Sequence, residues 1–433
     1  MPLARLCALA LVVLPIPAFA VDPQVTVIKA GVLIDGTGGT PIRNAVIVIE
    51  GERITAVGAG IAVAAKARVL DLSDSTVLPG FIDAHTHISA PLVSTPGWEE
   101  AHARETAVDT VLRGAFHARQ TLEAGYTTIR EVGARDFTDI SLRNAISRGW
   151  IVGPRMQVAA HAIGITGGHC DESGWVPNLL GHEPGIAEGI ANGPDEIRGA
   201  IRDQVKYGAD LIKICATGGV ISVGDTAGAQ QYSTEELRTA VETAHMLERR
   251  VAAHAHGTEG IKAAVRAGVD SIEHGCYLDE DPDLIPMMAE RSIFFVPTLT
   301  VYEYHRESTT PHVRERARAL REHHIDSVRR ALAAGVKVVA GTDAGGHGHP
   351  HNALELEHLV AAGMTPMQAL QAATRLAADC LGLGPEIGTI EKGKWADLVV
   401  VEGDPLRDIR VLQDARRIRR VIKAGVSVTR HHD

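Results

Sequence analysis

Several short apolar segments of this 433-residue chain end in histidine, lysine or aspartate. His85 and His87 follow an apolar segment that begins at Gly80, and their spacing points both side chains the same way on an extended chain. Two neutral imidazoles that face one way can chelate a divalent metal ion. An isolated pair of this kind is more often a surface feature, but its position directly after an apolar segment favours a metal site.

Lys213 interrupts the apolar run from Leu211 to Ile214. Lysine is rarely buried without a partner, so one interpretation is a side chain that extends outward to solvent. The other is a lysine carboxylated by CO₂, because a free amine with a pKa of about 10.4 is a poor metal ligand at neutral pH. A carbamate is negatively charged, and it can bridge two metal ions that stabilise it in return.

Three later segments end in further groups of the same kind. His254 and His256 end one segment, His274 ends the next, and Asp343 follows the segment Val338–Ala340. Each residue alone is weak evidence. Five segment ends that carry six metal-ligating side chains in this order are strong evidence for a metal centre.

The segments that bear these groups alternate with helical patterns, which is typical of parallel βαβ units. We predict an α/β fold, a (β/α)₈ TIM barrel, in which the active site lies at the carboxyl ends of the strands. Two of the helices have clear starts, a capping box at Ser233–Glu236 and a Thr365-Pro366 pair before a helix to about Leu381. The eight predicted strands are Gly80–Ala84, Thr127–Val132, Arg155–Ala160, Asp210–Ile214, Arg250–Ala253, Asp270–Glu273, Phe294–Leu299 and Val336–Ala340.

The residue pattern at both ends of the chain differs from the alternating strand and helix pattern of the middle. Short β-branched runs broken by glycine, such as Ala45–Ile49, return late in the chain as Asp397–Val401. We predict that residues 21–78 and 386–433 form one small discontinuous β-sandwich domain. The barrel then spans residues 79–385.

Residues 1–20 have the features of a secretory signal peptide. Arg5 precedes the apolar run Leu6–Ile16, and Ala18-Phe19-Ala20 is a small-x-small cleavage pattern. A membrane anchor is the alternative, but the run is shorter than the ~20 residues that span a bilayer. We expect cleavage after Ala20 and an exported protein, periplasmic or secreted, with no membrane association afterwards.

The spacing of the cysteines and the net charge of the chain argue against two classes of function, a zinc finger and a nucleic-acid-binding protein. Cys170, Cys215, Cys276 and Cys380 lie far apart without a Cys-x-x-Cys pair, so zinc-finger chemistry is unsupported. One disulfide is an alternative, and free buried thiols are the expectation. The formal net charge of −10 argues against nucleic acid as a partner, because phosphate binding needs clustered Lys and Arg.

The order His-x-His, Lys, His, His, Asp on the first, fourth, fifth, sixth and eighth strands resembles that of the amidohydrolase superfamily. The resemblance covers nearly the whole chain after residue 20. It implies two divalent metal ions, zinc before others, with carboxylated Lys213 as the bridge and Asp343 as general base. It also implies a homo-oligomer. The implied ligands are His85, His87, Lys213 and Asp343 for one metal and Lys213, His254 and His274 for the other. His256 could compete with His254, but His254 is favoured because the ligand in this superfamily is the histidine at the strand terminus.

Three motifs resemble a narrower group, the imidazolonepropionase-related dipeptidases, which includes Xaa-Pro dipeptidases and enzymes that release phenylalanine from ochratoxin A. The common reaction of this group cleaves an amide whose amine side is a C-terminal amino acid. The resemblance therefore implies a small-molecule or dipeptide substrate. The motifs are Thr166–His169, Ile212–Gly219 and His254–Gly257.

Polar residues near the strand ends are candidates for substrate contacts. His161 and His169, in the glycine-rich loop after the third strand, could each polarise the scissile carbonyl or be solvent-exposed loop residues. His256 and Tyr232 could bind the substrate carboxylate, although Tyr232 could equally be a packing residue. His347, His349 and His351, after the eighth strand, could line the mouth of the site, but we expect solvated loop residues.

Other functions remain open at this point. A lactonase, a cyclic-amide hydrolase or a deaminase would use related strand-end ligands. Two complete metal sites with a lysine bridge favour amide or ester hydrolysis over deamination, which usually runs on one metal. A non-catalytic metal-binding relative would typically lack ligands, and all six positions are filled here.

Overall fold

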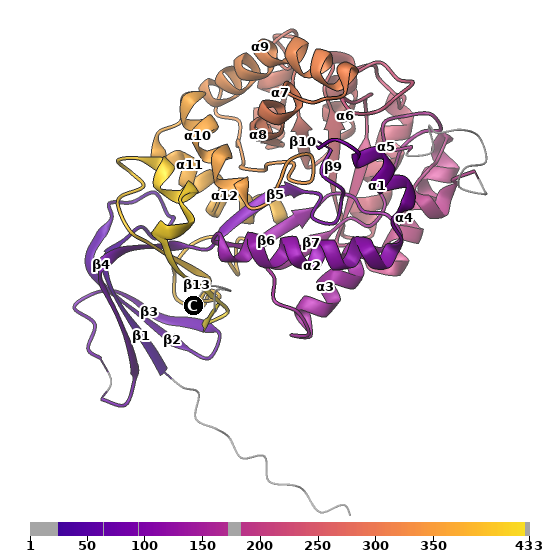
Figure 1. Cartoon of the computed structure of the whole chain (residues 1–433). Coiled ribbons are helices and arrows are strands. Elements are labelled where there is room, and N and C mark those ends of the chain that lie inside the picture. The colour runs from indigo at the N-terminus through magenta and orange to yellow at the C-terminus, as the bar shows by residue number, and fades with distance from the viewer. Residues whose placement is uncertain (1–24, 64, 94, 172–182, 429–433) are drawn as a thin grey trace, which may run out of the picture.

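The computed structural model describes residues 25–63, 65–93, 95–171 and 183–428. The predicted signal peptide, residues 1–20, lies outside these ranges. Figure 1 shows a barrel of strands and helices with a β domain packed at one side. Among the described residues, no helix has the length and apolar content needed to cross a membrane.

Seven of the eight predicted barrel strands form two parallel sheets, ordered β5-β6-β7 and β8-β9-β10-β11. Their interior side chains are almost entirely buried, as the apolar patterns predict. The strands are β5 (Phe81–Thr86), β6 (Tyr126–Glu131), β7 (Arg155–Val158), β8 (Leu211–Cys215), β9 (Arg250–Ala255), β10 (Ser271–His274) and β11 (Phe294–Val296).

The eighth predicted strand, residues 336–340, closes the barrel without forming a ladder of its own. Val338 pairs with Phe295 of β11, and the N–H of Ala84 in β5 donates to the carbonyl of Ala340 at 3.0 Å. On the other side, a bridge between Ile163 and Ile214 joins the two sheets. The predicted (β/α)₈ barrel is therefore confirmed.

Twelve α-helices occur among the described residues, and most cover the outside of the barrel (Figure 1). The predicted caps are present, since Ser233 and Glu236 form the capping box of α5 and Thr365 caps α11. The helices are α1 (Trp98–Arg104), α2 (Ala107–Glu123), α3 (Thr138–Ser147), α4 (Gly193–Tyr207), α5 (Thr234–Met246), α6 (Thr258–Ala267), α7 (Leu284–Glu290), α8 (Leu299–His305), α9 (Pro311–Ala333), α10 (Leu354–Ala361), α11 (Pro366–Ala372) and α12 (Arg375–Leu381).

The single helix predicted to run from Thr365 to about Leu381 is two helices. Thr374 has φ −133° and ψ −94°, which is not helical and separates α11 from α12. The carbonyls of Ala372 and Ala373 accept the backbone N–H groups of Ala340 and Ile82 from the barrel. Docking onto the barrel thus replaces the continuation of one helix.

The two chain ends form one seven-stranded sheet, so the prediction that they build one discontinuous β domain is confirmed. Its order is β14-β13-β12-β4-β1-β2-β3, and the antiparallel pairing of β4 with β12 joins the two ends. Gly425 lies against the carbonyl of Gly51, so the two ends of the sheet approach each other around a shared apolar core. The strands are β1 (Val25–Leu33), β2 (Ile42–Glu50), β3 (Arg53–Ala59), β4 (Arg68–Pro79), β12 (Leu398–Val401), β13 (Ile418–Lys423) and β14 (Val426–Ser427).

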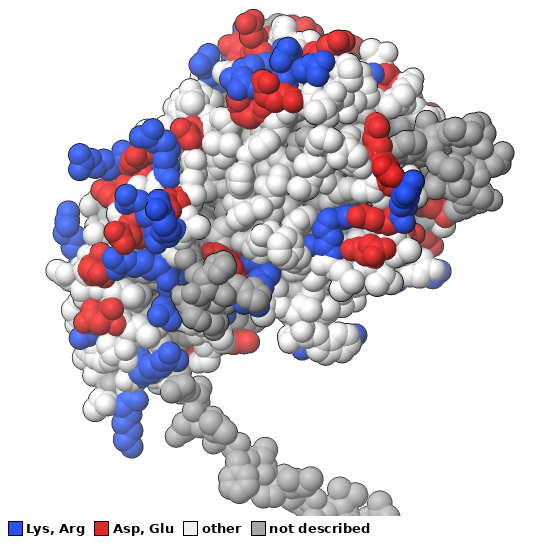
Figure 2. Space-filling model, in the orientation of Figure 1, with Lys and Arg blue, Asp and Glu red and all other residues white. Residues whose placement is uncertain are grey.

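The charged residues on the face shown in Figure 2 are mixed in sign and gather over the β domain, over α9 and near α1 and α2, while uncharged residues cover most of the surface between these groups.

Candidate metal centre and active site

The carboxyl ends of the barrel strands bring the predicted ligands together. Asp343 Oδ1 lies 3.6 Å from His85 Nε2 and 3.5 Å from His87 Nε2. The ring of His274 lies 5.0 Å from that of His85 and 4.6 Å from that of His254, centroid to centroid. Two sets of ligand atoms lie within 4.8 Å of one another, His85 with His274 and Asp343, and His254 with His256 and His274.

Three of these histidines are held in one tautomer by their surroundings. His87 Nδ1 lies 2.9 Å from the Gly133 carbonyl and His85 Nδ1 lies 2.7 Å from the Glu273 carboxylate, and both partners only accept. His274 Nδ1 lies 2.8 Å from Thr298 Oγ1, whose own proton is donated to a carbonyl. Each Nδ1 therefore carries the proton, which places the lone pair for a metal ion on Nε2.

Two of the ligands occupy strained backbone positions. His274 has φ +69° and Asp343 has φ +58°, a left-handed conformation that is uncommon for residues other than glycine. Thr298, the hydrogen-bond partner of His274, has φ +55°. These residues end or follow barrel strands, and the turn of the backbone aims their side chains into the cluster. Such strain is characteristic of functional sites.

The buried ion pair of Glu273 and Arg130 holds His85 by a hydrogen bond to its Nδ1. Glu273 is 0% exposed, and its carboxylate accepts from His85 Nδ1 and from Arg130 Nη2 at 2.7 Å each. Arg130 is 2% exposed and also donates to the carbonyl of Ala84 at 2.6 Å. The guanidinium compensates a carboxylate that would otherwise be buried unpaired.

Arg130→Met is expected to lower the free energy of unfolding by about 3–5 kcal/mol, because it leaves the buried Glu273 carboxylate without its cation. Chemical denaturation of the metal-free protein measures this change. Arg238→Met, on an arginine whose side chain is 63% exposed, is the matched control and should change stability little. Equal effects of the two substitutions would contradict the role of the ion pair.

Asp83 holds the segment that carries Asp343. Its carboxylate accepts from Thr342 N at 3.0 Å and Thr342 Oγ1 at 2.6 Å, and from Asn352 Nδ2 at 2.7 Å. Burial raises the pKa of Asp83 to about 6, while these hydrogen bonds act in the opposite direction. Asp83 of β5 thereby holds in place the loop that follows the eighth barrel strand and carries Asp343.

Burial also sets the protonation of the cluster. It lowers the pKa of the Lys213 amine to about 8, against the opposing charges of Glu273 and Asp343. It holds the pKa values of His85, His254, His256 and His274 well below their usual range and raises that of the Asp343 carboxyl. Neutral imidazoles and a deprotonable lysine are the forms that metal binding and carboxylation require.

The structure separates the two candidate carbonyl-polarising histidines. His161 Nδ1 lies 3.3 Å from Gln204 Oε1, and its Nε2 accepts from Asp136 N at 3.1 Å. Both ring nitrogens of His161 thus make hydrogen bonds in the wall of the barrel, and its catalytic role stays a prediction. The ring of His169 instead stacks on that of His254 at 4.0 Å, inside the cluster.

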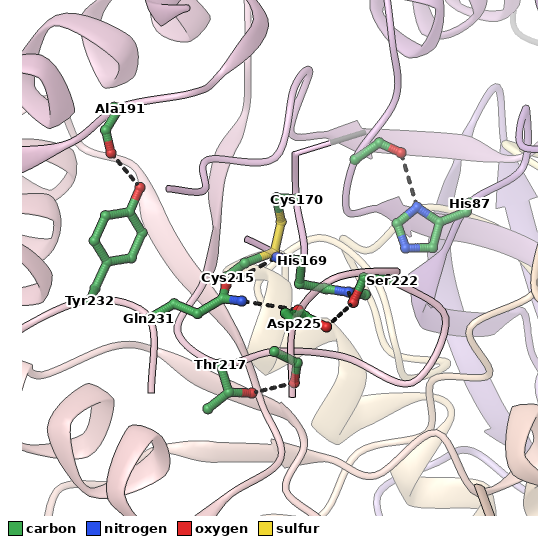
Figure 3. The surroundings of a disulfide bond; sticks show 12 residues. His87, His169, Cys170, Ala191, Cys215, Thr217, Ser222, Asp225, Gln231 and Tyr232 are labelled. Atoms are coloured by element: carbon green, nitrogen blue, oxygen red, sulfur yellow. Dashed lines mark hydrogen bonds between the residues drawn. A yellow bond between two sulfur atoms is a disulfide. The ribbon is translucent and has the colours of Figure 1, made fainter. Parts of the chain in front are cut away.

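The two candidate carboxylate-binding residues also differ. His256 stacks on His274 at 4.9 Å, and its Nδ1 lies 3.2 Å from Cys276 Sγ. Tyr232 is 1% exposed and donates to the carbonyl of Ala191 at 2.8 Å, as Figure 3 shows. Its hydroxyl is therefore occupied inside the apolar core, and the geometry favours the packing role for Tyr232 over substrate binding.

Two other expectations are wrong. Cys170 and Cys215 form a disulfide, with Cα atoms 6.1 Å apart, while Cys276 and Cys380 are free and buried as expected. His347 and His349 are 0% and 8% exposed rather than solvated. The ring of His347 stacks on Tyr304 and that of His349 on His117, so aromatic packing draws both inward. His351 is exposed, as predicted.

Sequence reasoning missed Glu273 and Arg130. The signal was present, because both are charged residues inside predicted barrel strands, as Lys213 is. Their pairing was invisible, since Arg130 and Glu273 lie 143 residues apart.

The residues present fit a pair of metal ions. His85 Nε2 and His254 Nε2 are buried and have no hydrogen-bond partner among the described residues. Buried imidazole nitrogens are seldom left unpaired, and here they face other ligand atoms. The donor set of imidazoles with one carboxylate is typical of zinc and related divalent ions.

Comparison with known proteins agrees with this geometry. The model of the amidohydrolase family matches residues 76–428. Ochratoxinase from Aspergillus niger is 34% identical, over 93% of this chain and 86% of the relative. Imidazolonepropionase from Solibacter usitatus is 25% identical, over 91% of each chain.

Solved structures resemble the whole chain. A Xaa-Pro dipeptidase with bound methionine in the active site has a TM-score of 0.88 and 37% identity, covering 94% of this chain and 100% of the other. A prolidase complexed with N-methylphosphonate-L-proline has a TM-score of 0.85 and 31% identity, with the same coverage. These relatives do not favour the lactonase and deaminase alternatives. The chain belongs to the amidohydrolase family and is a hydrolase acting on amide bonds.

Proposed function

We propose that this protein is a binuclear zinc hydrolase that releases a C-terminal amino acid from an N-acyl amino acid or a dipeptide. The observation that carries the proposal is the cluster of His85, His87, His254, His274 and Asp343 around buried Lys213. The ochratoxinase and the dipeptidases to which the chain is similar support the substrate class, which includes Xaa-Pro dipeptides and ochratoxin A.

Two divalent ions bound here would make hydroxide available at neutral pH and would polarise the scissile carbonyl. Asp343 orients the attacking hydroxide, accepts its proton and passes that proton to the leaving amine. Asp343 lies within reach of such a molecule, because its Oδ1 faces the Nε2 atoms of both His85 and His87.

Two histidines take the substrate roles. His169 stabilises the negative charge that develops on the carbonyl oxygen, because its ring stacks directly on His254 in the cluster. His256 lies beside the same ligands and is assigned to the α-carboxylate of the substrate.

Carboxylated Lys213 is the proposed bridge. CO₂ adds only to the neutral amine, so a pKa of about 8 makes the reaction dependent on pH. At a fixed concentration of dissolved CO₂, reactivation of metal-free protein by zinc should speed up about tenfold per pH unit below pH 8 and level off above it. Stopped assays of regained activity between pH 6.5 and 9 measure the rate. A reactivation rate that does not change with the CO₂ concentration would contradict the proposal that Lys213 is carboxylated.

A substrate screen tests the proposed function. Zinc-loaded enzyme is incubated with Xaa-Pro dipeptides, N-acyl amino acids and ochratoxin A, and the released amino acid is quantified. Lactones and cyclic amides serve as comparison substrates. Amino acid release from at least one of the first group is expected, and release from none of them would overturn the proposal.

We also propose that the protein is exported to an oxidising compartment. The Cys170–Cys215 disulfide supports this, because disulfides persist outside the reducing cytosol. N-terminal sequencing of protein recovered from the medium or the periplasm should begin after Ala20. Recovery of protein that retains residues 1–20 only in the cytosol would contradict export.

The homo-oligomer is proposed to form through α2. Val108, Leu112 and Phe116 recur every four residues on this helix and are 68%, 65% and 62% exposed. Exposed apolar stripes of this kind mark protein contacts. Leu112→Asp should shift the molar mass measured by light scattering toward the monomer, whereas Arg104→Asp, on an exposed residue of α1, should not. An unchanged mass would exclude α2 as the contact.

A further inference from the structure

A disulfide bond at the residue after His169 links its loop to β8, the strand that carries Lys213. Cys170 is bonded to Cys215, the last residue of β8, and Cys215 lies two residues after Lys213. Figure 3 shows the disulfide directly beside the His169 side chain. Ile163 and Gly164 make bridges to Ile214 and Ile190, and residues 165–171 after them contain no helix or strand. The cross-link therefore adds a covalent anchor directly after His169.

Hydrogen bonds hold both the backbone and the ring of His169. Its backbone N–H donates to Gln231 Oε1 at 3.1 Å, and Gln231 in turn donates to Asp225 Oδ2 at 3.0 Å. Its ring Nδ1 lies 3.2 Å from Ser222 Oγ, which donates to Asp225 Oδ1 at 2.7 Å. Asp225 is thus the common acceptor behind both contacts, as the dashed lines in Figure 3 show in part.

The segment that carries these partners is itself anchored. The guanidinium of Arg316 on α9 donates to the carbonyls of Gly219, Ser222 and Asp225 at 2.9, 2.8 and 2.6 Å. Gly219 also makes room for the ring, because a Cβ on this residue would lie 2.1 Å from His169 Nδ1. The ring is therefore confined by Gly219, by Ser222 and by its stacking on His254.

We propose that the Cys170–Cys215 disulfide and the Ser222–Asp225 pair are positioning elements that hold His169 against the reacting carbonyl. The proposal rests on the role of His169 in the proposed function. The disulfide limits the movement of the backbone and Ser222 limits the rotation of the ring. A displacement of about 1 Å in such a group can cost about 10²-fold in rate.

The main experiment removes the cross-link. Cys170→Ala/Cys215→Ala should lower kcat by about 10- to 100-fold, with KM changed less than about threefold and two metal ions per chain retained. Ser222→Ala, which leaves the disulfide intact, should also lower kcat, by about tenfold. Ser141→Ala, on an exposed serine of α3, is the matched control and should have no effect.

A double-mutant comparison separates positioning from general stabilisation. In a His169→Ala background, the cysteine replacements should lower kcat by less than about twofold, because the group that they position is absent. A phosphine reductant, which converts the disulfide to two thiols and becomes the phosphine oxide with oxygen from water, should lower kcat of the wild type but not of the Cys170→Ala/Cys215→Ala variant. Equal losses with and without His169 would overturn the proposal.

Hydrogen exchange gives a readout that does not depend on turnover. In the Cys170→Ala/Cys215→Ala variant, amides of residues 161–171 should exchange at least about tenfold faster, while β9 and β10 remain unchanged. Unchanged exchange together with unchanged kcat would overturn the inference. A wild type that hydrolyses no substrate in the screen would instead refute the proposed function, and the exchange experiment would still show whether the disulfide holds the loop.

Discussion

Asp343→Asn is expected to lower kcat by about 10³-fold or more, because an amide cannot accept the proton of the attacking hydroxide. The fold around the residue should survive. The backbone N–H of Asp343 donates to the His85 carbonyl at 2.8 Å, and this contact does not involve the side chain. Asparagine also tolerates the left-handed conformation at φ +58° better than alanine does.

Steady-state kinetics on the best substrate of the screen measures this effect. Metal content and circular dichroism are recorded on the same samples, so that a loss of metal is not mistaken for a loss of the base. Asp195→Asn, on an aspartate whose side chain is 99% exposed, is the control. Full activity of Asp343→Asn would show that the mechanism is wrong.

Lys213→Ala is expected to lose metal and activity together, because it removes the residue that would bridge the two ions. Lys213 is 3% exposed, and its charge contributes to lowering the pKa values of His254 and His274, so its side chain lies close to both. Elemental analysis should find fewer than two metal ions per chain, and turnover should fall at least about 10³-fold.

Chemical rescue tests the form of the bridge. Acetate supplied to Lys213→Ala occupies the space vacated by the side chain and offers a carboxylate, so it should restore part of the metal binding. Lys206→Ala, on an exposed lysine of α4, should behave as the wild type. Normal metal content in Lys213→Ala without any carboxylate would contradict a bridging role.

The metal centre was predictable because a parallel barrel converts chain order into proximity. Residues that end successive strands must meet at one face, so His85, His254 and His274 could be placed together without any coordinates. The barrel strands were predictable for a related reason, since their burial on all sides produces continuous apolar runs such as Phe294–Val296.

The surroundings of the ligands were not predictable in the same way. Glu273 was read as part of a strand, and only the structure shows that it binds both His85 and Arg130. The pattern of the glycine-rich loop could not distinguish His161 from His169 either. Their difference arises from Gln204 on one side and His254 on the other, which approach from separate parts of the chain.

The sequence by itself determined the barrel, the discontinuous β domain and the six candidate ligands, because these depend on local periodicity and on the order of strand ends. The tertiary structure alone decided the tautomers of the ligand histidines, the Cys170–Cys215 pairing and which loop histidine faces the cluster. These features depend on contacts between residues far apart in the sequence. In such contacts, a shift of one residue or the rotation of one ring changes which side chains meet. Spacing along the chain carries no record of such contacts.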